Sequence, residues 1–420
     1  MVQRIPRRVA LLVFVPFALG HFLSYLYRTV NAVISPDLAR DLGLGASDLG
    51  LLTSTYFLTF AAAQLPIGVA LDRYGPRRVQ FPLLTLAACG AALFATSESL
   101  ATVALARALI GLGVAGCLMS AIKAVTQWLP AERVPFATGL LLAVGGLGAM
   151  TSTAPLEAML RITDWRGVFL CLAGATVLVA LLILAVSPER PGATKATSFS
   201  EQIAAVGQLY SSRGFWRVAF YSLFANATYM AVQALWMAHW LRDVAGFDRT
   251  AVGTALLVGT TAMVAGSISL GWLTDRLRVL GFRPVLTCGG GIAAFLCVQL
   301  AMIAGDGRGA LALAFLFGFF GTATTLNYAI VAQSVPGHLT GRVSTCFNLL
   351  IFLLAFAVQW MIGALLDLWS PTAGGHYPPE AYRFVLGIVL ALQVPGLLLW
   401  LSLRPWQRNA AMPAAVAGAA

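Results

Sequence analysis

Charged side chains are scarce in this chain. Asp, Glu, Lys and Arg together make up 10% of its 420 residues, whereas a soluble domain carries roughly a quarter. Hydrophobic residues reach 59%, and the mean hydropathy is +0.83. No soluble fold of this length can bury that much apolar surface, so the composition excludes a water-soluble protein. It predicts an integral membrane protein whose helix exteriors face lipid.

Cysteine is also scarce, and its placement excludes further chemistry. All six cysteines fall inside apolar segments, and none has the Cys-x-x-Cys spacing. They are interpreted as small buried hydrophobic residues, so neither a disulfide nor a metal site is expected. The phosphate-binding signature G-x-x-x-x-G-K-[ST] is missing, which argues against ATP-driven pumping. No nucleophile–base constellation is visible. We therefore expect no catalytic residue, no cofactor and no enzyme activity.

Apolar segments of membrane-spanning length recur along the whole chain. A bilayer core needs roughly 20 apolar residues per helix, and twelve such segments are predicted. A polar stretch rich in chain breakers separates six from six. The predicted division is a bundle over 1–186, a cytoplasmic linker over 187–216, a bundle over 217–403 and a cytoplasmic tail over 404–420. The spans are predicted near 10–35, 46–71, 79–97, 100–128, 136–158, 165–186, 217–241, 250–274, 284–304, 309–331, 342–368 and 383–403.

Basic residues outnumber acidic residues by 27 to 16, which gives a net charge of +11. With both termini in the cytoplasm, most Lys and Arg fall in cytoplasmic segments, as the positive-inside rule requires. The reversed topology would put the excess outside. The basic residues are scattered over many short loops, so no nucleic-acid partner is expected. We expect a monomer in a cell's inner membrane, with the lipid bilayer as its surroundings.

Two short stretches read alike and lie 203 residues apart. GVALDRYGPRR begins at Gly68, and GWLTDR begins at Gly271. The pattern G-x-x-x-D-R, with x-G-x-R-R following in the first copy, resembles the loop between the second and third helices of the major facilitator superfamily. The second copy lacks the later glycine. The resemblance covers about 10–403 and implies an all-α membrane protein, with twelve helices in two pseudo-symmetric six-helix bundles.

The resemblance also implies a gate. In this superfamily the acid of the first loop faces the start of the eleventh helix, and the acid of the second loop faces the start of the fifth. Helix N-termini attract anions. Here Asp72 would lie near 338–344 and Asp275 near 134–139, and the contacts would hold the cytoplasmic side closed. The expected gating residues are Gly68, Asp72, Arg73, Gly75, Arg77, Gly271, Asp275 and Arg276.

The fourth predicted span carries a further pattern of the superfamily. Arg107, followed by Gly111 and Gly113, resembles the fourth-helix pattern R-x-x-x-G-x-G. Glycines at this spacing let helices approach closely. Arg107 is expected to be structural rather than substrate-binding. Lys123 lies about five residues from the inner end of the span, which fits either the cytoplasmic gate or a lysine reaching toward the lipid headgroups.

Arg28 lies deep in the first predicted span, where an ionisable side chain is costly and usually functional. His21, Tyr25 and Arg28 share a helix face. The placement of Arg28 ahead of Pro36 and Asp48 resembles the organophosphate:phosphate antiporters and the anion:cation symporters, in which a first-helix arginine binds the substrate anion. A planar guanidinium can hold a carboxylate through two hydrogen bonds. The alternative is an arginine that is paired within the protein or reaches outward.

The seventh predicted span departs from the phosphate-handling relatives, because it has no arginine before Arg242 at its outer edge. This favours a smaller or singly charged organic anion, such as a monocarboxylate. Tyr229, Gln233 and Trp236 share one face, which would either contact that anion or serve helix packing. Asn327 and Asn348 are further candidates of the same kind.

No acidic residue lies at the middle of a predicted span. For a co-transported proton the best central candidate is His21, followed by Glu157, whereas an exchanged anion would require neither. The expected function is secondary active transport of a small organic solute by alternating access. A drug or metabolite efflux carrier and a non-transporting membrane receptor on the same fold are the alternatives.

Overall fold

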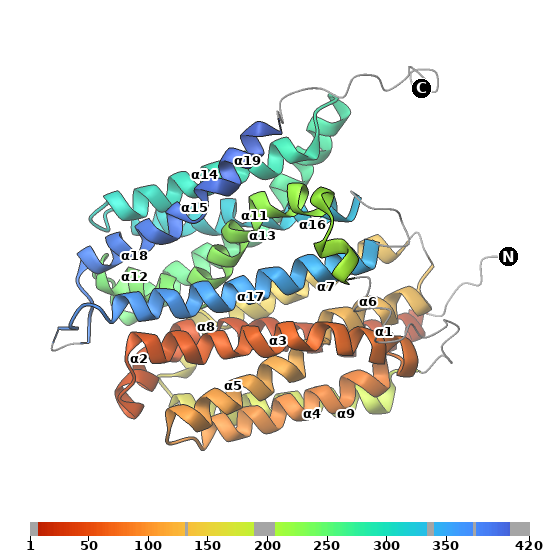
Figure 1. The fold of residues 1–420 in the computed structure, drawn as a ribbon. Coiled ribbons are helices and arrows are strands. Elements are labelled where there is room, and N and C mark those ends of the chain that lie inside the picture. The colour runs from red at the N-terminus through yellow and green to blue at the C-terminus, as the bar shows by residue number, and fades with distance from the viewer. Residues whose placement is uncertain (1–6, 131–132, 189–205, 334–339, 373–374, 404–420) are drawn as a thin grey trace.

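A computed structural model describes residues 7–130, 133–188, 206–333, 340–372 and 375–403. These residues fold into helices joined by short connections, and none of them forms a strand. The helices run side by side along the long dimension of the molecule (Figure 1). Eleven of the described helical segments are long and apolar enough to cross a membrane. The predicted all-α membrane architecture is confirmed.

The described residues of the first half form nine helices. The first predicted span, 10–35, is two helices, because one ends at Thr29 and the next begins at Asn31. Gly43 stops the second with φ +64°, a conformation that favours glycine. In chain order the helices are α1 (Arg7–Thr29), α2 (Asn31–Leu42), α3 (Ala46–Tyr74), α4 (Pro76–Ala95), α5 (Leu100–Val114), α6 (Cys117–Trp128), α7 (Val134–Thr151), α8 (Ala154–Met159) and α9 (Trp165–Val186).

The second half differs most from expectation at its first span. The predicted segment 217–241 contains a π-helical turn between two α-helices and is not among the eleven apolar spans. Such turns occur mostly as single insertions within α-helices. The elements are α11 (Arg213–Ala231), the π-turn η2 (Val232–Trp236), α12 (Met237–Asp243), α13 (Arg249–Val279), α14 (Pro284–Ala304), α15 (Ala310–Gly321), the 3₁₀ turn η3 (Thr322–Thr325), α16 (Leu326–Gln333), α17 (Thr340–Leu366), α18 (Pro379–Ala391) and α19 (Val394–Ser402).

Small residues allow close packing within each half. A Cβ at Gly111 of α5 would lie 2.5 Å from the carbonyl oxygen of Tyr56, and one at Gly113 would lie 2.5 Å from the carbonyl oxygen of Leu83. A side chain at either position would therefore separate α5 from α3 or α4. The fourth-helix glycine pattern thus lies where α5 approaches two neighbouring backbones closely.

Among the contact zones that join the halves, two involve α3 and α13, and we call them the first and second seams. In the first seam α3 packs along α17; in the second, α13 packs against α7 and α8. Residues 203 apart correspond to each other in the repeat. Ala46, the first residue of α3, therefore corresponds to Arg249, the first residue of α13. The seams are therefore equivalent under the internal repeat.

The molecule has two distinct ends. The end that carries α2, the start of α3 and the end of α17 lies on the left of Figure 1, and we call it the far end. The opposite end carries the start of α1 and the junction of α3 with α4, and we call it the terminal end. Gly75, with φ +79°, forms the junction between α3 and α4.

Candidate functional site

Arg28 occupies the last turn of α1, where a cation is favoured by the helix dipole. Its guanidinium carbon lies 4.6 Å from the centre of the Tyr25 ring, 5.4 Å from Phe60 and 5.3 Å from Phe352. Phe60 comes from α3 and Phe352 from α17, and their rings stack 4.3 Å apart. Arg28 therefore lies between the two halves, at the first seam.

The polar groups that face Arg28 are tyrosine hydroxyls. Tyr56 lies within hydrogen-bonding reach, and Tyr25 and Tyr328 are also near. Among the residues that the structure describes, no carboxylate forms an ion pair with Arg28, and its Nε has no hydrogen-bond partner. The site thus presents a positive charge with aromatic and hydroxyl neighbours and without a countercharge of its own.

A chain of hydrogen bonds crosses between the halves beside this arginine. The Tyr328 hydroxyl donates to Asn348 Oδ1 at 2.7 Å, and Asn348 Nδ2 donates to Gln64 Oε1 at 3.2 Å. Gln64 comes from α3, whereas Tyr328 comes from α16 and Asn348 from α17. The structure therefore brings Asn348 to the Arg28 group. Gln64, Tyr56, Phe60 and Phe352 join it as well, and sequence reasoning did not select them.

His21, Tyr25 and Tyr229 also gather near Arg28. The His21 ring is buried, meets the Tyr25 ring edge-on at 5.0 Å and has no hydrogen-bond partner among the described residues. Tyr229, from α11 in the other half, faces Tyr25. Five of the eight predicted substrate contacts thus lie in one region: Arg28, His21, Tyr25, Tyr229 and Asn348. Their role in binding stays a prediction.

The other candidates have different surroundings. Gln233 Nε2 donates to Met263 Sδ at 3.6 Å, and Trp236 Nε1 donates to the Gln359 backbone oxygen at 3.2 Å. Asn327 donates to Ser222 at 2.7 Å and to a backbone carbonyl, and it accepts from Tyr221 at 2.6 Å. Asn327 therefore uses its hydrogen-bonding groups within the second half.

The predicted gate loops lie at the terminal end. Lys123 of α6 donates to Asp72 at the end of α3, so two motifs that the sequence suggested separately form one ion pair within the first half. The predicted partner segment of Asp72, 338–344, lies partly outside the described residues. Asp275 is 75% exposed and lies 3.8 Å from Arg278 on its own helix. The cross-half gate therefore stays a prediction.

Five further gate residues lie on the same elements as these acids or just after them. Gly68 lies in α3 and Gly271 in α13. The Arg73 guanidinium lies over the Tyr74 ring at 5.3 Å, and that of Arg276 lies over Trp272 at 5.4 Å. Arg77 is in the first turn of α4, and its Nε is buried with no hydrogen-bond partner in the described part of the chain.

Arg107 is fully buried inside the first half. Its Nη1 donates to the Tyr27 backbone oxygen at 2.9 Å, and its guanidinium lies over the Tyr56 ring at 5.0 Å. Tyr56 therefore has Arg107 on one side and Arg28 within reach on the other. The structural role of Arg107 stays a prediction.

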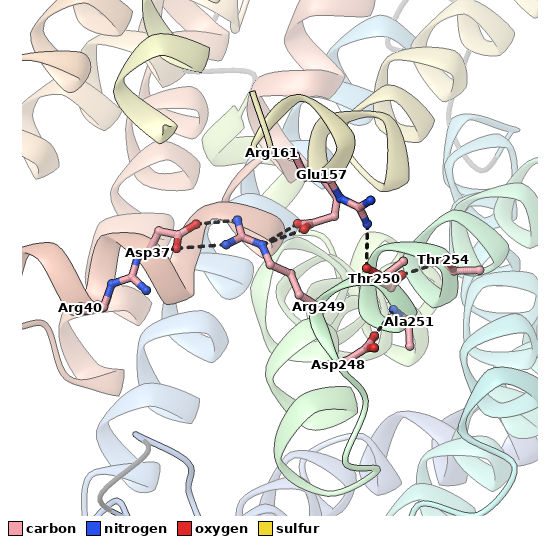
Figure 2. Close-up of polar contacts among 9 residues, drawn as sticks. All are labelled: Asp37, Arg40, Glu157, Arg161, Asp248, Arg249, Thr250, Ala251 and Thr254. Carbon is pink, nitrogen blue, oxygen red and sulfur yellow. Dashed lines mark hydrogen bonds and ion pairs between the residues drawn. The ribbon is translucent and has the colours of Figure 1, made fainter. Parts of the chain in front are cut away.

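At the far end, the second seam carries a cluster of ion pairs that sequence reasoning missed. Figure 2 shows Arg249 between Asp37 of α2 and Glu157 of α8. Arg249 Nη2 lies 2.6 Å from Asp37, and Arg249 Nε lies 2.8 Å from Glu157. Arg249 is the first residue of α13, where a cation is disfavoured by the helix dipole. Its position there is explained by these two carboxylates of the other half.

The first seam is closed at the far end by a different device. The Asp367 carboxylate, just past α17, accepts from the backbone N–H groups of Ala46 at 3.1 Å and Ser47 at 2.8 Å, the first residues of α3. Tyr377 donates to it at 2.6 Å. Burial raises the pKa of Asp367, but these hydrogen bonds outweigh burial and hold its pKa below the ordinary value.

Comparison with known proteins gives the family. The model of the major facilitator superfamily matches residues 17–358. This chain belongs to the major facilitator superfamily. Among curated proteins, it is 26% identical over 274 residues to a probable sulfoacetate transporter of Cupriavidus necator, covering 62% of this chain and 63% of that protein. It is 23% identical over 387 residues to a probable L-galactonate transporter of Escherichia coli, covering 87% and 84%.

Solved structures show the same fold. A bacterial homolog of the human lysosomal transporter Spinster superposes with a TM-score of 0.77 at 16% identity, covering 95% of this chain and 98% of that one. The nucleoside transporter NupG gives 0.75 at 12% identity, covering 94% and 100%. The predicted superfamily is confirmed, as are the multi-pass membrane transporter class and the expectation that the chain is not an enzyme.

Proposed function

We propose that this superfamily member is a secondary active transporter of a small organic anion, and that Arg28 binds the negative group of that anion. The observation that carries the proposal is the uncompensated charge of Arg28 at the contact of the two halves. An arginine without a partner in a low-dielectric site costs several kcal/mol. A carboxylate or sulfonate would supply the missing countercharge through bidentate hydrogen bonds.

The similar proteins support this substrate class. They are described as a probable sulfoacetate transporter, a probable L-galactonate transporter and a hexuronate transporter, and all three solutes are acids. Tyr25 and Tyr229 would contact the uncharged part of the solute, and Asn348 would offer its amide to hydroxyl groups. Because the hydrogen-bonding groups of Asn327 are occupied, we place it behind the site.

The halves would rock about this position, so that Arg28 faces the two sides of the membrane in turn. The basic residues of the termini favour the cytoplasm for the terminal end, so the far end would open to the outside. Single cysteines at Ile162 and Val279, which are 90% and 84% exposed at opposite ends, test this orientation. In intact cells an impermeant reagent should label only the cysteine at Ile162.

Binding calorimetry tests the role of Arg28. The ligands are sulfoacetate, galactonate and glucuronate, with galactose as an uncharged comparison. Arg28→Ala should abolish acid binding, and Arg28→Lys should weaken it about tenfold or more, because lysine keeps the charge but loses the planar fork. Arg308→Ala, at a side chain that is 92% exposed, is the matched control and should bind as the wild type does. Acid binding that survives Arg28→Ala would refute the anion assignment.

A further inference from the structure

The second-seam cluster consists of charges that belong to different halves. Arg249 comes from the second half, whereas Asp37 and Glu157 come from the first. The side chains of the two acids are only 12% and 7% exposed. If the halves rock, Arg249 moves away from both acids when the far end opens. Each acid must then find another cation, reach water or bind a proton, because an unpaired buried carboxylate is costly.

The two acids differ in what remains beside them. Arg40, three residues along the same helix, donates to Asp37 at 2.8 Å, so Asp37 keeps a cation when Arg249 leaves. Glu157 has no such ion-pair partner within the described residues of the first half. Arg161 follows it in the chain, but the Arg161 guanidinium donates to Thr250 at 2.8 Å (Figure 2). Glu157 is therefore the acid whose charge depends on Arg249.

A small cavity borders Glu157. It has a volume of about 110 Å³, enough for a few water molecules. Its walls come from α2, α8, α12 and α13, and Glu157 is the only carboxylate among its lining residues. Arg242, also in the wall, is already paired with Asp243 at 2.7 Å. The titratable and charged groups that face Glu157 from the surrounding elements are Asp37, Arg40, Arg161, His239, Arg242 and Arg249.

We propose that Glu157 is the proton-binding residue of the transport cycle, and that a proton and Arg249 occupy its carboxylate in turn. While the far end is closed, Arg249 neutralises Glu157. When this end opens, Arg249 withdraws and Glu157 binds a proton from the medium on that side; as the end closes, Arg249 returns and the proton goes back to the same medium. This inference rests on the alternating access of the proposed function and makes the pH of the medium at the far end the control of its opening.

Cysteine accessibility in the purified protein, without substrate, tests the exchange. The reporter is Val33→Cys in the cavity wall, where the native side chain is 6% exposed, so reaction requires opening of the far end. A water-soluble maleimide is applied at about pH 8 and about pH 5. Because thiol reactivity itself changes with pH, each rate is divided by that of Ile162→Cys, an exposed position at the same end. The chain without either reporter gives the background from the native cysteines.

The expected result is that acidification raises the normalised rate at least about tenfold, because protonation removes the partner of Arg249. Glu157→Gln imitates the protonated acid and should react fast at both pH values. Asp37→Asn should raise the rate but keep the pH response. Asp306→Asn removes an exposed acid that pairs with Arg308 at the same end and within one half, and it should behave as the wild type does.

Several results would overturn the proposal. These are a wild-type rate that is flat with pH, a Glu157→Gln variant that keeps the pH response, and a response that disappears instead in Asp37→Asn, His21→Gln or His239→Gln. If Glu157→Gln does not fold, Arg249→Lys serves instead. It should shift the pH response to higher pH, because lysine holds the carboxylates less firmly, and an unshifted response would contradict the proposal. Since no substrate is present, these outcomes are independent of whether Arg28 binds an anion.

Discussion

The two seams are equivalent under the internal repeat, yet they are held together at the far end by different forces. In the first seam α3 and α17 approach so closely that a Cβ at Gly363 would lie 2.4 Å from the Ala46 carbonyl oxygen. In the second, a Cβ at Gly253 would lie 3.3 Å from its nearest neighbour, the Cβ of Glu157. The first seam is thus defined by backbone shape, and the second by the charges around Arg249.

Because of this difference, we expect the two seams to have different roles in opening and closing. Contact between backbones is insensitive to pH and salt, and it returns the two halves to the same relative position whenever they close. Charge pairing is strong only while water is kept out, and protonation or salt weakens it. The first seam therefore sets where the halves meet, whereas the second decides when they separate.

The largest effect is expected from Gly363→Ala. The added methyl group would meet the backbone of α3, which cannot move as cheaply as a flexible side chain, and such overpacking costs about 1–3 kcal/mol. Far-end closure and substrate uptake by reconstituted vesicles should fall about tenfold or more. Gly253→Ala, on the second seam, should cost at most a few-fold.

The matched control for this pair is Gly387→Ala. Gly387 lies in α18, and a Cβ there would have no neighbour within 4 Å, so uptake should be unchanged. Equal losses from Gly363→Ala and Gly253→Ala would show that both seams depend on backbone shape and would remove the distinction.

A smaller effect is expected at the terminal end. Asp72→Asn breaks the pair with Lys123 and should lower initial uptake by a factor of about 2–30, since a helix-end charge contact contributes roughly 0.3–2 kcal/mol. Melting temperature and membrane insertion should not change. Asp275→Asn, in the exposed second copy of the motif, should have less effect than Asp72→Asn. Uptake at the wild-type rate in Asp72→Asn would remove the gate hypothesis.

The smallest effect is expected from Asp367→Asn. The lowered pKa of Asp367 means that its contribution to closure is complete above the ordinary carboxyl pKa and is lost only as the pH falls through the lowered value. Between about pH 8 and about pH 5 it stays charged. Asp367→Asn should therefore raise Val33→Cys labelling about threefold at every pH and leave its pH dependence intact. A changed pH dependence would give both seams a role in proton binding.

Much of the fold could be predicted from the sequence, because long apolar segments leave few alternatives to membrane helices. The offset between Gly68 and Gly271 located the repeat, and the helical spacing of His21, Tyr25 and Arg28 placed them on one face. The π-turn could not be predicted, since it depends on packing around α11. The Arg249 cluster could not be predicted either, because Asp37 and Arg249 lie 212 residues apart in different halves. One clue was present in the sequence, because Arg249 lies at the start of a helix, where a cation is unfavourable and needs nearby carboxylates.

The stacked rings of Phe60 and Phe352 have a consequence for the electrochemical gradient across the membrane. Apolar constrictions exclude water, and an interrupted water column conducts neither protons nor small ions. The rings belong to opposite halves and stack beside Arg28, so they would interrupt the path through the resting carrier. A membrane could then contain many idle copies without losing its electrochemical gradient. Replacement of both rings by alanine should appear as a substrate-independent leak current.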